Sequence, residues 1–451
     1  MKKIQCVVTA KDTGYRLSYL DNIIDQSEND KNSNNVNLII NPKEKKQKVI
    51  GFGGAFTEAS AVALAGVDNS LKSQAIKAYF DPKEGIAYNL CRTPIGASDF
   101  SQHIYSYDDT ENDIELIDFS VRDDSDTIIP MIHRAMQLQN NLFIYATPWS
   151  PPAWMKTNRM MTNGGKLREE FRSVYAKYLV RFIDEYKKNG IDLWGLSIQN
   201  EPVEIQEWPS CCYSAKEEAD FIKNYLIPEL EKYKRRDLKI LLWDCNKDIL
   251  YNRIQEEMSI LQDNKSIFSV AFHWYSGDYF EELDALHEEY PKLELISTES
   301  CVPFCLDIKK WDVAEKYAHE IIGDFNHWTN GYIDWNLFLD EKGGPNLANN
   351  YCLSPIILDR DHNELIYLPA YFYIGHFSKF IERDAVVLGR RIVGDIESCA
   401  FIQSNGEIVV VIMNKYQCEN VISFHIDGEK EFYKIRLLPH SIVTLLINKE
   451  F

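Results

Sequence analysis

Eight apolar runs alternate with stretches of helical spacing, and this pattern restricts the fold more than any other feature of the chain. Near-continuous apolar runs are typical of parallel strands covered on both faces. In the gaps, for example over 167–188 and 215–233, apolar residues recur three and four positions apart, which predicts amphipathic helices. Eight strand–helix repeats predict an α/β fold, a closed (β/α)8 or TIM barrel, over residues 50–383. The predicted strands cover residues 50–56, 88–95, 142–147, 193–199, 240–244, 269–275, 293–298 and 332–339.

An open, doubly wound sheet is the competing architecture for alternating strands and helices. Proteins with that fold often bind nucleotides on a glycine-rich turn after the first strand. Gly51, Gly53 and Gly54 resemble such a turn only superficially, because their spacing lacks the dinucleotide pattern and the phosphate-binding lysine. The number of repeats and the missing phosphate turn favour the barrel.

The two ends of the chain carry a different pattern. Residues 384–451 contain short β-like runs at close spacing, and Asn405-Gly406 and Asp427-Gly428 predict hairpin turns between them. Residues 1–49 contain only two such runs, separated by a polar stretch over 25–35 that we expect to be a loop. Two short strands do not form a stable sheet alone. We therefore expect 1–49 and 384–451 to build one β-sandwich domain from both chain termini.

The charge balance excludes several classes of partner. The formal net charge is -19, so the chain is expected to bind no nucleic acid and no anionic membrane surface. No apolar run reaches the roughly 20 residues of a membrane-spanning helix, so no stable membrane insertion is expected. The apolar run over 4–8 is too short for a signal peptide, which predicts a cytoplasmic location, with a trimmed secreted form as the alternative. The ten cysteines lack the spacing of a zinc site and are expected to be reduced thiols.

Polar and aromatic residues gather at the predicted carboxyl ends of the strands, where barrels place their active sites. Glu201 follows the fourth strand and Glu299 the seventh. Two carboxyl groups that face each other across a pocket can cleave a glycosidic bond, one as proton donor and one as nucleophile or base. Flat aromatic faces suit the apolar faces of sugar rings. The further candidates at strand ends are Arg92, Asp99, Trp149, Asn200, His273, Tyr275 and Trp335.

Each candidate also has a simpler explanation when it is considered alone. His273 could be a hydrogen-bonded core histidine, Trp149 and Trp335 could be packing residues, and Asp99 could be a turn residue. Their joint occurrence at the ends of successive strands favours a single catalytic pocket.

Nine segments of the chain resemble glycoside hydrolase family 30, and specifically its glucosylceramidase branch. They occur in the family's order and span most of the predicted barrel. The segments are GFGGAFTEASA at 51–61, RTPIGASDFS at 92–101, ATPWSPPAWMKTN at 146–158, NEP at 200–202, HWY at 273–275, TES at 298–300, DWNL at 334–337, GGPN at 343–346 and GHFSKF at 375–380.

The resemblance implies a retaining β-glycosidase that needs no cofactor and no metal. It implies that Glu201 is the acid/base and Glu299 the nucleophile. Asp99, Trp149, Asn200, Trp335 and Asn350 match positions that hold the sugar, and Arg92, His273 and Tyr275 match residues around the nucleophile.

The substrate stays open at this stage. Members of the family hydrolyse β-glucosides, β-1,6-glucan and β-xylosides, and a β-fucoside is a further alternative. The strongly negative charge favours a soluble glucoside or oligosaccharide over a membrane-embedded lipid. A sugar-binding barrel without turnover is the remote alternative, and the sequence does not indicate an oligomeric state.

Overall fold

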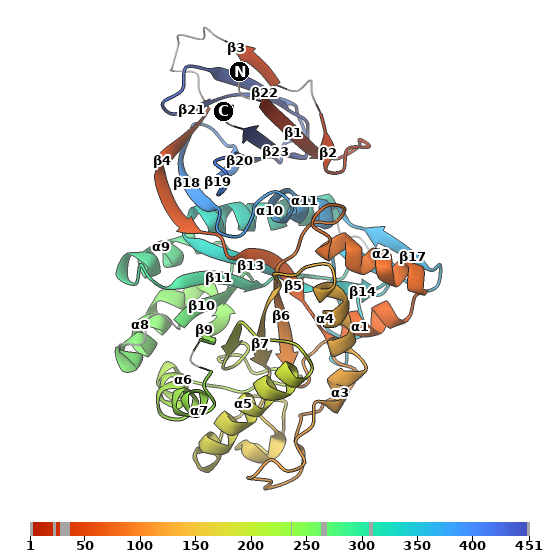
Figure 1. Ribbon diagram of the computed structural model, residues 1–451, viewed down its shortest axis with the longest axis vertical. Coiled ribbons are helices and arrows are strands. Elements are labelled where there is room, and N and C mark those ends of the chain that lie inside the picture. Colours follow the sequence, from red (N-terminus) through yellow and green to blue (C-terminus); the bar gives the residue numbers. More distant parts are fainter. Residues whose placement is uncertain are drawn as a thin grey trace.

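The computed structural model describes residues 3–20, 24–27, 37–235, 237–262, 268–305 and 310–448. Figure 1 shows two domains, a barrel surrounded by helices and a smaller β domain above it. Within the described ranges, no helix combines the length and the apolar character needed to cross a membrane.

Eight parallel strands close into a barrel, as the sequence predicts. Strand β13 pairs with β5, so the ring of hydrogen-bonded strands is complete. The eight strands follow one another around the ring in chain order. They are β5 (Gly51–Ala55), β6 (Leu90–Ile95), β7 (Phe143–Pro148), β8 (Gly195–Ser197), β9 (Lys239–Asn246), β10 (Phe268–His273), β11 (Glu294–Glu299) and β13 (Thr329–Asn336).

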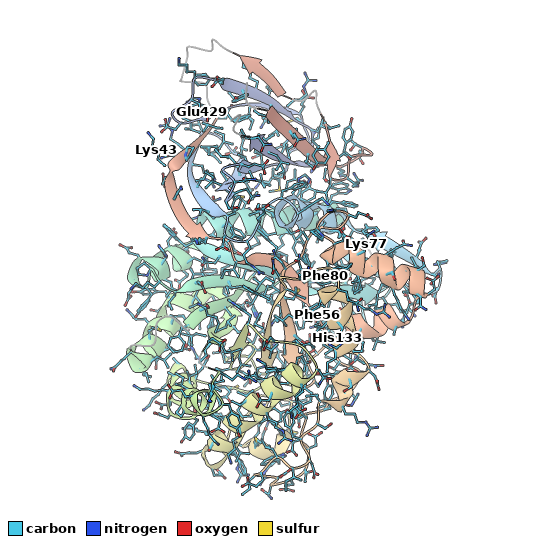
Figure 2. The ribbon with its side chains drawn as sticks, viewed as in Figure 1. Lys43, Phe56, Lys77, Phe80, His133 and Glu429 are labelled. Carbon is cyan, nitrogen blue, oxygen red and sulfur yellow. The ribbon has the colours of Figure 1, made fainter. Side chains whose placement is uncertain are left out.

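Helices cover the outside of the barrel (Figure 1). Phe80, the last residue of α2, stacks on Phe56 at the end of β5 with ring centroids 5.6 Å apart (Figure 2). Such contacts bury the apolar faces that the 3.6-residue period predicts. The helices are α1 (Glu58–Ala65), α2 (Asn69–Phe80), α3 (Arg122–Ser125), α4 (Ile128–Met136), α5 (Arg172–Lys188), α6 (Ala215–Phe221), α7 (Ile227–Lys232), α8 (Leu250–Leu261), α9 (Phe280–Glu289), α10 (Lys310–Asn326) and α11 (Pro369–Ser378).

Two helices differ in detail from the sequence prediction. The helix expected over 167–188 begins at Arg172, because Leu167 pairs with Lys156 in a β-bridge instead. The helix expected over 215–233 contains a π-helical turn at Ile222–Leu226 between α6 and α7. Pro228 lies at the start of α7, and its missing backbone N–H explains why the regular hydrogen-bond pattern is interrupted there.

The β domain is a ten-stranded sheet that combines strands from both ends of the chain. Strand β1 lies between β2 and β23, and β4 lies between β18 and β21. The β-sandwich expected from both termini is therefore observed. Its strands are β1 (Lys3–Ala10), β2 (Ser18–Tyr19), β3 (Ile24–Ser27), β4 (Leu38–Lys48), β18 (Val386–Ile392), β19 (Glu397–Ile402), β20 (Ile408–Asn414), β21 (Asn420–Ile426), β22 (Phe432–Leu437) and β23 (Ser441–Asn448).

The prediction of a loop over 25–35 is wrong for its first three residues. Asp25, Gln26 and Ser27 belong to β3, which pairs with β22 at the edge of the sheet. The backbone of a polar segment can still complete an exposed sheet edge, and periodicity of apolar residues does not detect such strands. Residues 28–35 lie outside the described ranges.

Helices α10 and α11 lie between the barrel and the β domain (Figure 1) and contact strands of both. The buried side chain of His376 on α11 lies 2.8 Å from the Thr444 hydroxyl and 2.9 Å from the Thr9 hydroxyl. Burial lowers the pKa of His376 to about 3, so its ring is neutral and acts as a structural hydrogen-bonding group between the two domains.

The interior of the barrel is filled by a layer of apolar side chains, which makes it a packed core rather than a channel. The layer separates the amino-terminal end of the barrel from its carboxyl-terminal end. It consists of Leu90, Tyr145, Leu241, Ala271, Ile296 and Ile333.

Gly53 of β5 lies tightly against the backbone of the neighbouring strand β6, and we predict that Gly53→Ala strongly destabilises the barrel. A Cβ at Gly53 would lie 1.6 Å from the backbone oxygen of Leu90, so the strands must move apart. Overpacking of this kind is expected to cost about 3 kcal/mol of unfolding free energy, the upper end of the usual range, because the clash is with backbone atoms. Gly14→Ala is the matched control, because a Cβ at Gly14 meets nothing within 4 Å. Equal thermal denaturation midpoints for the two variants would contradict the prediction.

Candidate active site

A polar layer lies directly above the apolar layer, towards the carboxyl ends of the strands. Successive inward-facing positions of a strand are two residues apart. Arg92 therefore follows Leu90, and His273 follows Ala271, as the next inward-facing residue of its strand. The same step brings Thr147, Ser197 and Thr298 into this layer, where all three donate hydrogen bonds to Asp244.

Asp244 enters the polar layer through a bulge in β9. Trp243 and Cys245 of β9 pair with the consecutive residues Ala271 and Phe272 of β10, so Asp244 is the extra residue of its strand. Trp243 and Asp244 have φ values of 75° and 58°, in the left-handed region that non-glycine residues rarely adopt. A bulge redirects side chains in this way, and it turns Asp244 into the barrel.

Arg92 connects the polar layer to the pocket above it. Its buried guanidinium donates to Glu299, to Asn200 Oδ1 at 2.8 Å and to Asp244 Oδ2 at 3.0 Å. The same group lies 4.8 Å from the ring centroid of Trp149. Although burial opposes the charged form, the Arg92 guanidinium and the His273 ring hold the pKa of Asp244 far below its usual range.

His273 bridges Asp244 and Glu201. Its Nε2 lies 3.1 Å from Asp244 Oδ1, and its Nδ1 lies 3.1 Å from Glu201 Oε1. Burial favours the neutral ring, but the charge of Glu299 and the hydrogen bonds to Asp244 and Glu201 raise the pKa of His273 to about 9. The ring is therefore a cation at neutral pH and donates to one oxygen of each of these carboxyl groups.

The two glutamates of the sequence prediction meet across the pocket. One carboxylate oxygen of Glu201 and one of Glu299 lie within 4.8 Å of each other. Glu201 follows β8 with a φ of 47°, and its backbone N–H donates to the Asp244 carbonyl at 2.9 Å. Backbone strain of this kind persists where surrounding contacts enforce it, and it is common at active sites.

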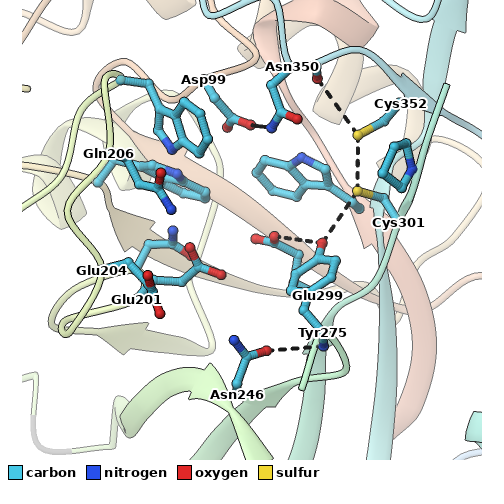
Figure 3. A pocket seen from close by; sticks show the side chains of 15 residues that line it. Asp99, Glu201, Glu204, Gln206, Asn246, Tyr275, Glu299, Cys301, Asn350 and Cys352 are labelled. Atoms are coloured by element: carbon cyan, nitrogen blue, oxygen red, sulfur yellow. Dashed lines mark hydrogen bonds between the residues drawn. The ribbon is translucent and has the colours of Figure 1, made fainter. Parts of the chain in front are cut away.

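Glu299 ends β11 and is held from two sides. Besides Arg92, the Tyr275 hydroxyl donates to Glu299 Oε1 at 2.9 Å (Figure 3). Burial raises the pKa of Glu299, while the charges of His273 and Arg92 and the Tyr275 hydrogen bond oppose that shift. These donors fix the orientation of the carboxylate. A group that must approach one particular atom of a substrate needs such a fixed orientation.

A cavity of about 340 Å³ lies above these carboxyls. On one wall Trp149 and Trp335 stack with ring centroids 5.2 Å apart. Asn350, which also lines the cavity, donates to Asp99 at 3.1 Å (Figure 3). Burial, with the charge of Glu299, raises the pKa of Asp99 to about 8. Eight of the ten predicted site residues line the cavity, and Arg92 and His273 lie beneath it in contact with them. The eight are Asp99, Trp149, Asn200, Glu201, Tyr275, Glu299, Trp335 and Asn350.

Glu201, His273 and Glu299 form the one group of potential metal ligands found among the described residues. A histidine that is protonated on both ring nitrogens has no lone pair for a metal. Because both nitrogens of His273 face carboxylates and its pKa lies near 9, the trio suits ion pairing better than metal binding.

Several residues of the site are not among the sequence candidates. Asp244 stands at a predicted strand end, but only the bulge shows that it points inwards. Cys301 and Cys352 line the cavity with their Sγ atoms 3.1 Å apart. They meet because Val302–Pro303 (β12) pairs with Cys352–Leu353 (β15), a short contact that no sequence pattern indicates. Glu204, Gln206 and Asn246 also line the cavity.

The charge on His273 gives a pH-dependent stability that can be measured. Its folded pKa of about 9 lies above the unfolded value of about 6.5, so the stabilisation is complete below pH 6.5 and is lost as pH rises towards 9. We expect the stability difference between wild type and His273→Gln to shrink by as much as about 3 kcal/mol between those pH values, measured by urea unfolding. His133→Gln, a change of an exposed histidine, is the control. A difference that is constant with pH would contradict the assignment.

Comparison with known proteins agrees with this geometry. Residues 49–381 match the model of the glycosyl hydrolase family 30 TIM-barrel domain, and residues 384–445 match that of the family's beta sandwich domain. The lysosomal acid glucosylceramidase of Mus musculus is 33% identical over 401 residues, which cover 84% of this chain and 77% of the mouse protein. The crystal structure of SrfJ from Salmonella typhimurium has a TM-score of 0.95 and 32% identity, with 100% of both chains covered. The endo-β1,6-glucanase BT3312 has a TM-score of 0.86 and 26% identity over 99% of this chain and 100% of its own. The chain therefore belongs to glycosyl hydrolase family 30.

Proposed function

We propose that this glycoside hydrolase cleaves β-glucosides with retention of configuration, through a covalent glycosyl-enzyme on Glu299. The observation that carries the proposal is the approach of the two carboxylates to within 4.8 Å. Retaining glycosidases hold their carboxyls about 5 Å apart, whereas inverting enzymes leave roughly 6.5–9.5 Å for a water molecule. The separation in this pocket supports direct attack by a carboxylate.

In the first step Glu299 attacks the anomeric carbon while Glu201 gives its proton to the departing oxygen. Arg92 and Tyr275 hold Glu299 in one orientation, which supports its role as nucleophile. In the second step Glu201 takes a proton from water, and the resulting hydroxide displaces Glu299 from the sugar. The His273 contact keeps Glu201 directed at the bond in both steps.

The residues around Trp149 and Trp335 are proposed to bind the glucosyl unit. Asp99 and Asn350 supply polar atoms for its hydroxyls, and the indoles supply apolar surface. Asn200 uses its Oδ1 to accept from Arg92, so its Nδ2 is the group left to donate to a sugar hydroxyl. A donor to the 2-hydroxyl can strengthen its hydrogen bond towards the transition state.

Hydrolysis of β-1,6-glucan is the second candidate. The similarity to the endo-β1,6-glucanase BT3312 over nearly the whole chain supports it, although the identity of 26% is below that to the mouse glucosylceramidase. β-Xylosides and β-fucosides are further substrates to compare. The hydrolysis of simple β-glucosides and that of β-1,6-glucan use the same two carboxyls. These two candidate functions therefore differ in the aglycone and not in the mechanism.

We predict that Glu299→Gln reduces hydrolysis of an aryl β-glucoside by at least about 10³-fold, because removing a nucleophile abolishes the covalent route. Glu294→Gln, at the opposite end of the same strand, is the matched control and should retain activity. Circular dichroism of both variants checks that the fold is intact. Wild-type rates in a folded Glu299→Gln protein would rule out the assigned nucleophile.

Retention itself has a separate test. Proton NMR of an aryl β-glucoside reaction should show the β-anomer of glucose first, followed by slow mutarotation to the α-anomer. Two successive displacements at the anomeric carbon each invert it, so the starting configuration returns. An α-anomer that appears first would indicate an inverting enzyme and would contradict the role given to Glu299.

A further inference from the structure

We infer that residues 203–208, which follow the acid/base Glu201, form an aglycone subsite that selects a neutral sugar, with Glu204 as its main discriminating residue. The inference rests on the proposed β-glucosidase function and specifies its substrate class. The leaving oxygen must lie beside Glu201 to receive the proton. Side chains directly after Glu201 are therefore placed to touch the leaving group.

The segment alternates between the cavity and solvent. Glu204, Gln206 and Trp208 line the cavity. Val203 and Ile205, on either side of Glu204, are 44% and 69% exposed, and Glu207 is exposed as well. The alternation places one polar and aromatic edge of the segment, made by these three side chains, against the cavity. Figure 3 shows Glu204 and Gln206 beside Glu201, across the cavity from Glu299.

The backbone of the segment is firmly anchored. The buried ammonium of Lys156 donates to the Ser210 carbonyl at 2.5 Å and to the Met161 carbonyl at 3.0 Å. The Asn163 N–H donates to the Gln206 carbonyl at 2.8 Å. The Gln206 N–H in turn donates to Ser210 Oγ at 3.2 Å. A side chain carried by such a fixed backbone discriminates between ligands better than one on a loose loop.

The polar groups of this edge are free to bind a ligand. Among the described residues, no side chain or backbone group hydrogen-bonds to the carboxylate of Glu204 or to the side-chain amide of Gln206. Asn246 on the adjoining wall accepts the Tyr275 N–H at 3.0 Å through Oδ1, which leaves its Nδ2 as a donor. The opening thus carries both acceptor and donor groups, and hydroxyl groups can satisfy both kinds.

These groups favour a neutral sugar over other aglycones. Glu204 adds a negative charge to a cavity that already holds Glu201 and Glu299, so an anionic leaving group would be repelled. An alkyl chain against Glu204 and Gln206 would strip water from polar groups without replacing its hydrogen bonds. Trp208 packs beside the aromatic cluster of Trp149 and Trp335 and offers a flat face to a second sugar ring.

The test compares Glu204→Leu with Glu207→Leu, a matched change at an exposed glutamate of the same segment that does not line the cavity. Rates are measured with an aryl β-glucoside, with the glucose disaccharides linked β-1,2, β-1,3, β-1,4 and β-1,6, and with micellar glucosylceramide. Glu204→Leu should lower the kcat/KM ratio of the preferred disaccharide to the aryl glucoside by about tenfold or more, the size expected for one lost hydrogen bond to a charged group. Glu207→Leu should leave that ratio unchanged.

The outcomes separate this inference from the proposed function. If wild type does not hydrolyse the aryl glucoside, the proposed β-glucosidase function itself fails. If wild type hydrolyses it but Glu204→Leu leaves the ratio unaltered, the subsite assignment is overturned. Turnover of glucosylceramide that exceeds every disaccharide, and that rises in Glu204→Leu, would also overturn it and would indicate a lipid aglycone.

Discussion

The contact between Arg92 and Asp244 at the carboxyl end of the barrel is the interaction on which the site depends. Both side chains are fully buried. Burying each ion costs several kcal/mol, and the pair is stable only when other hydrogen bonds satisfy the remaining polar atoms. Asp244 meets this requirement with donors from β7, β8, β10 and β11 as well as β6. The donors are Arg92, Thr147, Ser197, His273 and Thr298.

The same cluster determines the charge of the pocket. Two cations, Arg92 and His273, face the three carboxyl groups of Asp244, Glu201 and Glu299. If all three were ionised, one negative charge would remain uncompensated in a region that excludes most water. Burial, together with the negative charge of Glu299, also raises the pKa of Asp99 on the wall of the same cavity to about 8.

Much of the fold and of the site could be predicted from sequence because both follow a regular period. The strands are apolar runs, and Arg92 and His273 lie two residues beyond interior residues of those strands. Asp244 breaks this period, and its importance appears only with the bulge in β9.

Two buried histidines illustrate a second limit of prediction from sequence. His273 is charged among carboxylates and His376 is neutral between two threonines, yet both are fully buried. Their surroundings come from distant segments, so local sequence cannot distinguish them.

The two sides of the cavity differ in how their polar groups are engaged. On the side proposed for glucose, Asn200 and Asp99 already have partners in Arg92 and Asn350, and these contacts fix their orientation before a ligand arrives. On the other side, Glu204 and Gln206 belong to an anchored backbone, and among the described residues their side chains form no hydrogen bond with the charge cluster beneath. Substitutions over 203–208 can therefore change the preference for the aglycone without disturbing Arg92 or Asp244. This separation gives a physical reason why the leaving group can differ between relatives that keep the same barrel, one named a glucosylceramidase and another an endo-β1,6-glucanase.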